Sequence, residues 1–180
     1  PRADLFRSEL EAYLLMVRES GLDAMKPRGS YAGAMGIPQF LPSSFRRYAV
    51  DFDADGRRDL MTVADAIGSV ANYYREFGWQ TGGAVLVPAT VSGDTEALLK
   101  AGIKPHVTVS ELKRLGVVPT AAVEEGIEAA LFTAEAESGP RYWLGLNNFY
   151  VITRYNRSVN YALAVHELAQ ELRMLVRPGG

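Results

Sequence analysis

Hydrophobic residues recur at helical spacing in three parts of the chain. Over residues 4–18, apolar side chains fall every three or four positions on one face, with charged residues between them. The same period over residues 63–77 and 159–175 predicts two further amphipathic helices. Between the first two, Ser43 or Ser44 is placed to cap a short helix that ends near Tyr48.

A different pattern begins after Gly82. Residues 84–91 are apolar and β-branched between glycines, which predicts a strand. Residues 128–134 and 141–146 predict two more strands that pair around the turn Ser138-Gly139-Pro140. Residues 110–115 predict a short capped helix, and residues 148–153 fit either a helix or a strand.

These elements predict an α+β protein that is mainly α. The simplest partition places a helical core in residues 1–82 and 147–180, interrupted by a small α+β insertion at 83–146. Its length suits one ordinary domain or a core with a small satellite. The sequence begins with Pro1 rather than Met, so we expect the chain to start inside a longer precursor.

Composition excludes several classes of function. Nineteen Lys and Arg against 21 Asp and Glu give a net charge of −2, which carries no signal for nucleic acid or an anionic membrane. The absence of cysteine excludes disulfides, thiolate metal sites and a cysteine nucleophile, and two histidines do not favour a multi-histidine metal site. No apolar run is long enough to span a bilayer.

An acidic loop follows the short helix. Asp51, Asp53 and Asp55 stand at positions one, three and five, and Gly56 stands at position six, as in the first half of an EF-hand calcium loop. A hard cation needs six to eight oxygen ligands, and the backbone carbonyl of Arg57 would supply the one at position seven.

The second half of the acidic loop departs from that pattern. Position twelve is Thr62, which cannot be a bidentate carboxylate ligand, whereas Asp65 lies one helical turn later and would reach back if the loop is longer than usual. We therefore expect a structural Ca²⁺ site over residues 51–65. The alternative is a solvated acidic turn.

A glycine-rich loop precedes the short helix. Gly33 and Gly36 permit backbone conformations and close approaches that other residues obstruct. Ser30 and Gln39 offer hydroxyl and amide groups that suit the hydroxyl and acetamido groups of a sugar. From these residues alone, a binding loop and a purely structural turn remain equally open.

Five segments together resemble a known family. They are Ser30-Tyr-Ala-Gly-Ala-Met-Gly-Ile-Pro-Gln-Phe-Leu-Pro-Ser-Ser44, Tyr48-Ala-Val-Asp-Phe-Asp-Ala-Asp-Gly56, Asp65-Ala-Ile-Gly-Ser-Val-Ala-Asn-Tyr73, Asn148-Phe-Tyr-Val-Ile-Thr-Arg-Tyr-Asn156 and Tyr161-Ala-Leu-Ala-Val165. In this order they are similar to the membrane-bound lytic murein transglycosylase B family and its soluble relatives. The resemblance covers nearly the whole chain and is loose over residues 84–135.

The resemblance implies a lysozyme-like helical core with an EF-hand-like calcium loop and a small β-containing insertion. It implies cleavage of the β-1,4 bond from N-acetylmuramic acid to N-acetylglucosamine in peptidoglycan, with a 1,6-anhydro muramyl product. The expected partners are peptidoglycan glycan strands, no nucleic acid, and a membrane only through an anchor outside this sequence. The expected location is the bacterial periplasm or the periplasmic face of the outer membrane.

Matching motif positions implies which residues line the glycan cleft: Ser30, Gln39, Tyr73, Asn156 and Tyr161. Each has an alternative role. Tyr73 and Tyr161 lie beside apolar stripes and are also suited to packing, and Asn156 and Ser30 are also suited to local turn hydrogen bonds. The metal ligands implied by the same comparison are Asp51, Asp53, Asp55, Arg57 and Asp65.

The catalytic glutamate of the family is missing from the matched segments. It belongs to a Glu-Thr motif upstream of them, and this sequence contains no Glu-Thr pair. We expect the acid to lie before Pro1, in a segment that either precedes the chain or associates with it. Glu19, followed by Ser20, superficially resembles the acid of another lytic transglycosylase family, although a solvated surface carboxylate is the stronger interpretation. The remaining alternatives are a lysozyme-type hydrolase and a non-catalytic, calcium-stabilised glycan-binding module.

Overall fold

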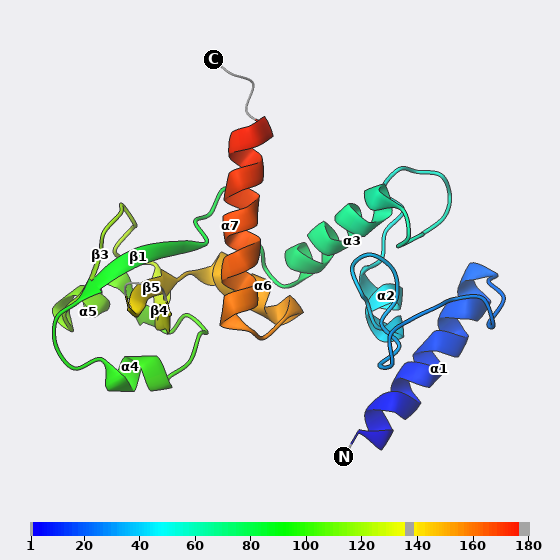
Figure 1. The fold of residues 1–180 in the computed structure, drawn as a ribbon, viewed down its shortest axis with the longest axis horizontal. Helices are drawn as coiled ribbons and strands as arrows, with labels where there is room; N and C mark the ends of the chain where they lie inside the picture. Colours follow the sequence, from blue (N-terminus) through cyan, green and yellow to red (C-terminus); the bar gives the residue numbers. More distant parts are fainter. Residues whose placement is uncertain (1, 136–138, 177–180) are drawn as a thin grey trace. The chain divides into compact units, whose positions relative to one another are not determined.

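The computed structural model describes residues 2–135 and 139–176 (Figure 1). The chain divides into two compact units, Pro1–Glu76 and Phe77–Gly180. Unit 1 is helical and holds the two loops singled out above, whereas the described residues of unit 2 form a sheet and four helices. Each unit is described by itself.

Unit 1 contains the helices α1 (Ala3–Ser20), α2 (Pro42–Tyr48) and α3 (Val63–Glu76). The first helix ends at Gly21, whose φ of 63° is left-handed, and the backbone N–H of Gly21 bonds the carbonyl of Val17. Helices α1 and α3 lie where the hydrophobic spacing predicts them, and α2 lies where the candidate serine caps predict a short helix.

The buried face of α1 differs from the predicted stripe. Leu10 and Leu14 are 58% and 55% exposed, whereas Ala12 and Met16 are buried. The face is rotated because α1 packs against α2 through a carboxylate as well as through apolar groups. Glu9, which is 9% exposed, accepts a hydrogen bond from the backbone N–H of Ser43 (3.0 Å) and another from its hydroxyl (2.6 Å).

This contact replaces the predicted serine cap of α2. The N-cap residue is Leu41 and its side chain makes no capping hydrogen bond, so the Glu9 carboxylate supplies the acceptor for the N-terminal turn. A negative charge at that end also suits the helix dipole.

The third helix buries small and polar residues rather than the predicted apolar stripe. Val63 and Ile67 are 66% and 62% exposed. Gly68 lies so close to Phe52 that a Cβ at position 68 would come within 2.5 Å of that side chain. The hydroxyl of Ser69 accepts a hydrogen bond from the backbone N–H of Val50. Close backbone approach therefore sets the orientation of α3.

Unit 2 is built on a five-stranded antiparallel sheet whose order is β2-β4-β5-β1-β3. The strands are β1 (Leu86–Val91), β2 (Val107–Thr108), β3 (Val117–Pro119), β4 (Glu128–Ala134) and β5 (Arg141–Gly145). The predicted pairing of the last two is confirmed, with Leu131 opposite Leu144. Ser138 of the predicted turn lies outside the described residues.

Four helices accompany the sheet: α4 (Glu96–Lys100), α5 (Val109–Arg114), α6 (Asn147–Tyr155) and α7 (Val159–Val176). Helix α5 is capped by Thr108. The hydroxyl of Thr108 accepts a hydrogen bond from the N–H of Glu111, and the Glu111 carboxylate accepts one from the N–H of Thr108. The ambiguous segment near residue 150 is helical. Figure 1 shows α7 beside α6.

One face of the sheet forms the core of unit 2 with α5. Val87, Leu112, Leu131 and Leu144 are at most 4% exposed and pack in one cluster. On the opposite face, Phe132 stacks on Phe149 of α6 with ring centroids 4.6 Å apart. The sheet is thus covered by different elements on its two sides.

The division into residues 1–82, 83–146 and 147–180 stays a prediction. Among the described residues, no helix combines the length and the apolar character needed to cross a membrane.

Replacing Gly116 by alanine should destabilise unit 2 strongly. Gly116 has a φ of 83°, and a Cβ there would overlap the carbonyl oxygen of Ser92. We expect a loss of about 2–4 kcal/mol in the free energy of unfolding, measured by urea titration. Gly102→Ala is the matched control, because Gly102 has a φ of 88° and open space around it, so only about 1 kcal/mol should be lost. Equal losses in the two variants would contradict the clash.

Replacing Glu9 by alanine should loosen α2 from α1. The N–H and hydroxyl of Ser43 would lose their acceptor, so we expect a loss of about 1–3 kcal/mol in the free energy of unfolding. Glu11→Ala on the same helix is the control, because Glu11 is exposed and its removal should change stability by less than about 0.5 kcal/mol. Thermal unfolding followed by circular dichroism makes the comparison.

Candidate functional site

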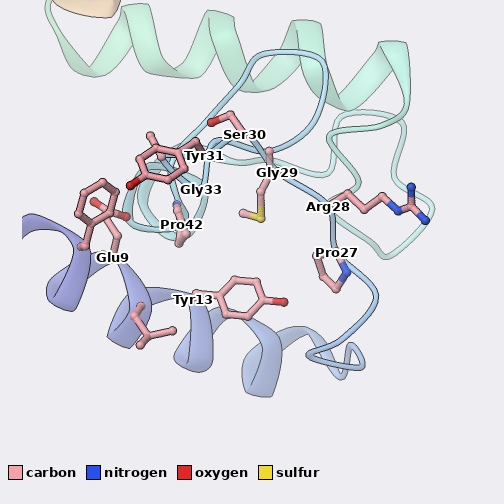
Figure 2. Close-up of a pocket in the computed structure, with 13 residues that line it drawn as sticks. Glu9, Tyr13, Pro27, Arg28, Gly29, Ser30, Tyr31, Gly33 and Pro42 are labelled. Atoms are coloured by element: carbon pink, nitrogen blue, oxygen red, sulfur yellow. The ribbon is translucent and has the colours of Figure 1, made fainter.

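A cavity of about 270 Å³ lies in unit 1 between α1 and the glycine-rich loop. Figure 2 shows Glu9 and Tyr13 on the helix side and Ser30, Tyr31 and Pro42 on the loop side. Most of the wall is aromatic, proline or glycine, with hydroxyl groups at Ser30 and the two tyrosines. A cavity with this lining suits a ligand that has both apolar faces and hydroxyl groups.

The glycine-rich loop is held by its own backbone. The N–H of Ser30 bonds the carbonyl of Ala34 (2.9 Å), and Met35 and Phe40 exchange two hydrogen bonds. Gly36 has a φ of 71°, and a Cβ there would lie 2.5 Å from the Cβ of Leu60. The sequence needs glycine at this point because the acidic loop passes directly behind it.

Ser30 and Gln39 come from opposite ends of this loop. The Ser30 hydroxyl, exposed at the cavity, accepts a hydrogen bond of 3.2 Å from the N–H of Ala34. Gln39 is also exposed, has a φ of 54°, and donates from Nε2 to the carbonyl of Gly36 (2.8 Å). Both therefore have local bonds and outward-facing polar groups, and Gln39 lies outside the wall of this cavity.

Tyr73 belongs to an aromatic cluster at the base of the loop. Its ring lies 4.8 Å from that of Tyr48 and 5.9 Å from that of Phe40, and the side chain is half-buried. Packing thus accounts for one part of its surface and leaves another part accessible.

Asn156 and Tyr161 lie in unit 2, at the junction of α6 and α7. Asn156 accepts a hydrogen bond from the N–H of Ser158 (3.0 Å), and Tyr161 stacks on Tyr155 with nearly parallel rings 6.3 Å apart. These two residues therefore lie in unit 2, whereas Ser30, Gln39 and Tyr73 lie in unit 1.

Glu19 is engaged in a way that opposes acid catalysis. Its carboxylate receives two hydrogen bonds from the guanidinium of Arg46 (2.8 and 3.1 Å), and this hydrogen bonding lowers the pKa of Glu19. A general acid needs a raised pKa. Glu9, for which the sequence offered no supporting context, is a buried carboxylate of this unit, as is Asp65, and its position three residues after Phe6 on the apolar side of α1 was the available signal.

The acidic loop gathers three carboxylates. Oxygens of Asp51, Asp53 and Asp65 lie within 4.8 Å of one another. The Asp51 carboxylate also accepts from the N–H groups of Asp55 and Gly56, so the loop closes on its first residue. Ala54, at a φ of 61°, and Gly56, at 86°, provide the reversal.

Asp65 is the buried member of this cluster. It is 1% exposed and accepts from the N–H of Asp59 and the N–H of Phe52, both at 2.7 Å. These bonds, first that of Asp59 and then that of Phe52, lower the pKa of Asp65 and keep it ionised. A converging set of carboxylate oxygens on a tight loop has the donor chemistry that Ca²⁺ prefers. The converging group consists of Asp51, Asp53 and Asp65, and the assignment of all five residues as ligands stays a prediction.

Comparison with known proteins identifies relatives over nearly the whole chain. The family model described as Transglycosylase SLT domain matches residues 1–170. The membrane-bound lytic murein transglycosylase B of Escherichia coli (strain K12) is 44% identical over 173 residues, which are 96% of this chain and 47% of that protein.

Solved structures agree with the sequence comparison. The catenated lytic transglycosylase SltB1 of Pseudomonas aeruginosa is 46% identical with a TM-score of 0.91, over 97% of this chain and 58% of that one. The Escherichia coli lytic transglycosylase Slt35 in complex with calcium is 41% identical with a TM-score of 0.84, over 97% and 55%.

The chain spans about half the length of the curated relative that it matches. Its mixed helical and stranded architecture is that of the lysozyme-like lytic transglycosylases, as the resemblance implied. The protein belongs to the family of the Transglycosylase SLT domain.

Proposed function

We propose that this protein contributes the glycan-binding part of a peptidoglycan lytic transglycosylase. The reaction cleaves the β-1,4 bond from N-acetylmuramic acid to N-acetylglucosamine and leaves a 1,6-anhydro muramyl end. One observation carries the proposal: identity of 44% to a lytic murein transglycosylase over 96% of the chain, which includes both the glycine-rich and the acidic loops.

The chemistry requires one carboxyl group. It donates a proton to the oxygen that leaves with N-acetylglucosamine, and the resulting carboxylate then takes the proton of the muramyl C6 hydroxyl. The C6 oxygen forms the new bond to the anomeric carbon, so no water is consumed. The remaining task is to hold the sugar so that its own hydroxyl attacks at close range.

The proposed binding residues fit that task. Ser30 and Gln39 present polar groups on a rigid loop, and Tyr73 backs that loop with an aromatic surface. In unit 2, Asn156 and Tyr161 combine an amide with a stacked aromatic ring. We assign a glycan-binding role to the three residues of unit 1 and to the two residues of unit 2.

The general acid is the part that these residues do not supply. Glu19 is ion-paired to Arg46 with a lowered pKa, and Glu9 is committed to Ser43. We therefore propose that the acid comes from sequence that precedes Pro1, as the family motif implies, and that this segment acts together with the glycan site.

A calcium site in the acidic loop accompanies the proposal. We assign Asp51, Asp53, Asp55, the carbonyl of Arg57 and Asp65 as ligands, with a structural role. Support comes from the convergence of three of the carboxylates and from a relative, Slt35, whose structure is a complex with calcium. Bound calcium would neutralise the repulsion among these charges and fix the segment behind Gly36.

A non-catalytic glycan-binding module is the second candidate. It is favoured by the engagement of both Glu9 and Glu19 in other contacts. Murein as the substrate places either version in the bacterial envelope, in the periplasm or at the periplasmic face of the outer membrane.

The proposed activity is tested on purified murein. The 180-residue protein should bind murein without releasing fragments, whereas a longer form that includes the preceding sequence should release 1,6-anhydro ends, identified by mass spectrometry. Reducing ends would instead indicate a hydrolase. Binding without release by the longer form would indicate a binding module, and release by the 180 residues alone would place the acid inside them.

Within the longer form, Ser30→Ala should weaken binding of a murein disaccharide by about three- to tenfold, because one hydrogen bond contributes about 0.5–1.5 kcal/mol. Ser8→Ala, an exposed serine on α1, is the matched control and should bind normally. Isothermal titration calorimetry provides the affinities. Equal affinity of the two variants would remove Ser30 from the site.

Calcium should stabilise the protein in a manner that depends on Asp65. At free calcium about one hundred times the Kd, binding to the native state alone adds about 2.7 kcal/mol, so a chelator should lower the Tm. Asp65→Asn should lower the Tm and abolish the calcium response. The control is Asp23→Asn, because Asp23 is an exposed aspartate that accepts a hydrogen bond from the N–H of Met25. This variant should keep both the Tm and the calcium response of the unaltered protein.

The same carboxylate predicts a dependence on pH. Because folding lowers the pKa of Asp65, its contribution is complete above the ordinary aspartate value of about 3.9 and is lost as the pH falls through the lower folded value. The Tm difference between Asp65→Asn and the unaltered protein should therefore shrink in acid. A constant difference from pH 7 to pH 2 would contradict this assignment.

A further inference from the structure

The sheet face opposite the core of unit 2 carries an aromatic and a cationic side chain in register. Trp143 of β5 stands opposite Pro88 of β1 and Phe132 of β4, and Arg141 stands opposite Ala134. Because Arg141 and Trp143 are two residues apart, they share one face of the strand. Trp143 is half-buried and Arg141 is exposed.

One face of α7 lies across from this part of the sheet. Asn160, Leu163, Ala164 and Glu167 follow the spacing i, i+3, i+4 and i+7, and with Arg141 and Trp143 they line a cavity of about 220 Å³. A larger groove of about 500 Å³ continues along β1 and β5 and shares Arg141 and Trp143 with it. Residues from three elements of unit 2 thus converge on one site.

The charges around this cavity do not neutralise one another. Arg141 contributes a cation, and Glu167 and Glu135 contribute anions. None of the three forms an ion pair with another residue of the ranges 2–135 and 139–176. Opposite charges held apart on the wall of a small cavity suit a ligand that carries both signs itself.

The cavity also adjoins the glycan residues of unit 2. Asn160, in its wall, immediately precedes Tyr161 on α7, and successive helical residues rise by about 1.5 Å. Neighbouring helical residues point about 100° apart, so a substituent of a sugar held at Tyr161 would have to extend part of the way around α7 to enter this cavity. Murein strands carry such a substituent, a short peptide on each muramyl residue.

We propose that the cavity between β5 and α7 binds the zwitterionic peptide stem of the murein substrate. The proposal rests on the glycan function proposed above. At the end of a stem side chain, Arg141 binds the carboxylate and Glu167 with Glu135 binds the ammonium group beside it, while Trp143 covers the aliphatic part of that side chain. The size of the cavity fits one amino-acid side chain rather than a whole drug-sized ligand.

Calorimetry with four ligands tests the proposal on the 180-residue protein. They are the peptide-free disaccharide N-acetylglucosaminyl-N-acetylmuramic acid, the same disaccharide bearing Ala-Glu-diaminopimelate, its analogue ending in lysine, and the free Ala-Glu-diaminopimelate peptide. Diaminopimelate ends in an ammonium and a carboxylate, whereas lysine lacks that carboxylate.

We expect the diaminopimelate stem to bind about tenfold more tightly than the peptide-free disaccharide, as one charge-assisted contact predicts. Arg141→Gln should remove most of this gain and leave the peptide-free affinity unchanged. The lysine analogue should show a smaller gain that Arg141→Gln does not reduce further. Glu167→Gln should weaken both peptide-bearing ligands.

Two exposed residues of α7 serve as matched controls. Arg173→Gln and Glu171→Gln remove the same charges away from the cavity and should behave like the unaltered protein. Losses of equal size in the controls would show a general charge effect and overturn the site.

The outcomes separate this site from the glycan proposal. If the peptide-free disaccharide binds and the stem adds nothing, the peptide site is wrong and the glycan function stands. If the free peptide binds through Arg141 while the disaccharide does not bind, the peptide site stands and the glycan function is wrong. If none of the four ligands binds, both are overturned.

Discussion

The buried carboxylate of Asp65 holds the acidic loop of unit 1 in place and, through it, supports the glycine-rich loop. It accepts hydrogen bonds from two points of the acidic loop, at Phe52 and Asp59, and so joins both ends of that loop to α3. Immediately after Asp59, Leu60 lies against Gly36, and its carbonyl accepts from the N–H of Ile37. The glycine-rich loop is therefore supported from behind by a segment whose position depends on one ionised side chain.

This dependence links the acidic loop to the glycine-rich loop. An acidic loop alone would expand through the repulsion of its own carboxylates, and a glycine-rich loop alone would lose its order at a high entropic cost. Because the two loops are in contact, the hydrogen bonds to Asp65 that close the acidic loop also support the conformation of the glycine-rich loop. A cation in the first would then act on ligand binding without touching the ligand.

Local patterns predicted the elements better than the surfaces that those elements bury. The helix spacing located α1, α3 and α7, a β-branched run located β1, and the segments on the two sides of a predicted turn located β4 and β5. The buried faces of α1 and α3 were predicted wrongly in part: Val17 of the α1 stripe is buried, but Glu9 and Gly68, which are not large apolar residues, make decisive contacts. Such contacts depend on partners distant in sequence, which periodicity does not reveal.

The candidate site likewise has parts that the local sequence predicts and parts that depend on residues distant in sequence. Three of the five predicted metal ligands converge, because their spacing along one loop determines their geometry. The candidate glycan-binding residues were identified by resemblance to the family. The local sequence did not distinguish a binding role from packing for Tyr73, or a binding role from a turn hydrogen bond for Asn156. The Arg141 and Trp143 pair was invisible in sequence, since its partners come from a sheet register and a helix more than fifteen residues away.

The close contact between Gly68 and Phe52 also limits how the acidic loop can be exchanged among proteins. The aromatic side chain one residue into the loop occupies the space that any larger residue at position 68 would need. A loop transplanted from an unrelated calcium-binding protein would fit only if its residue at position 52 were compatible with the residue at position 68 of α3. In natural diversification, the loop and the helix behind it should accordingly be inherited as a single module.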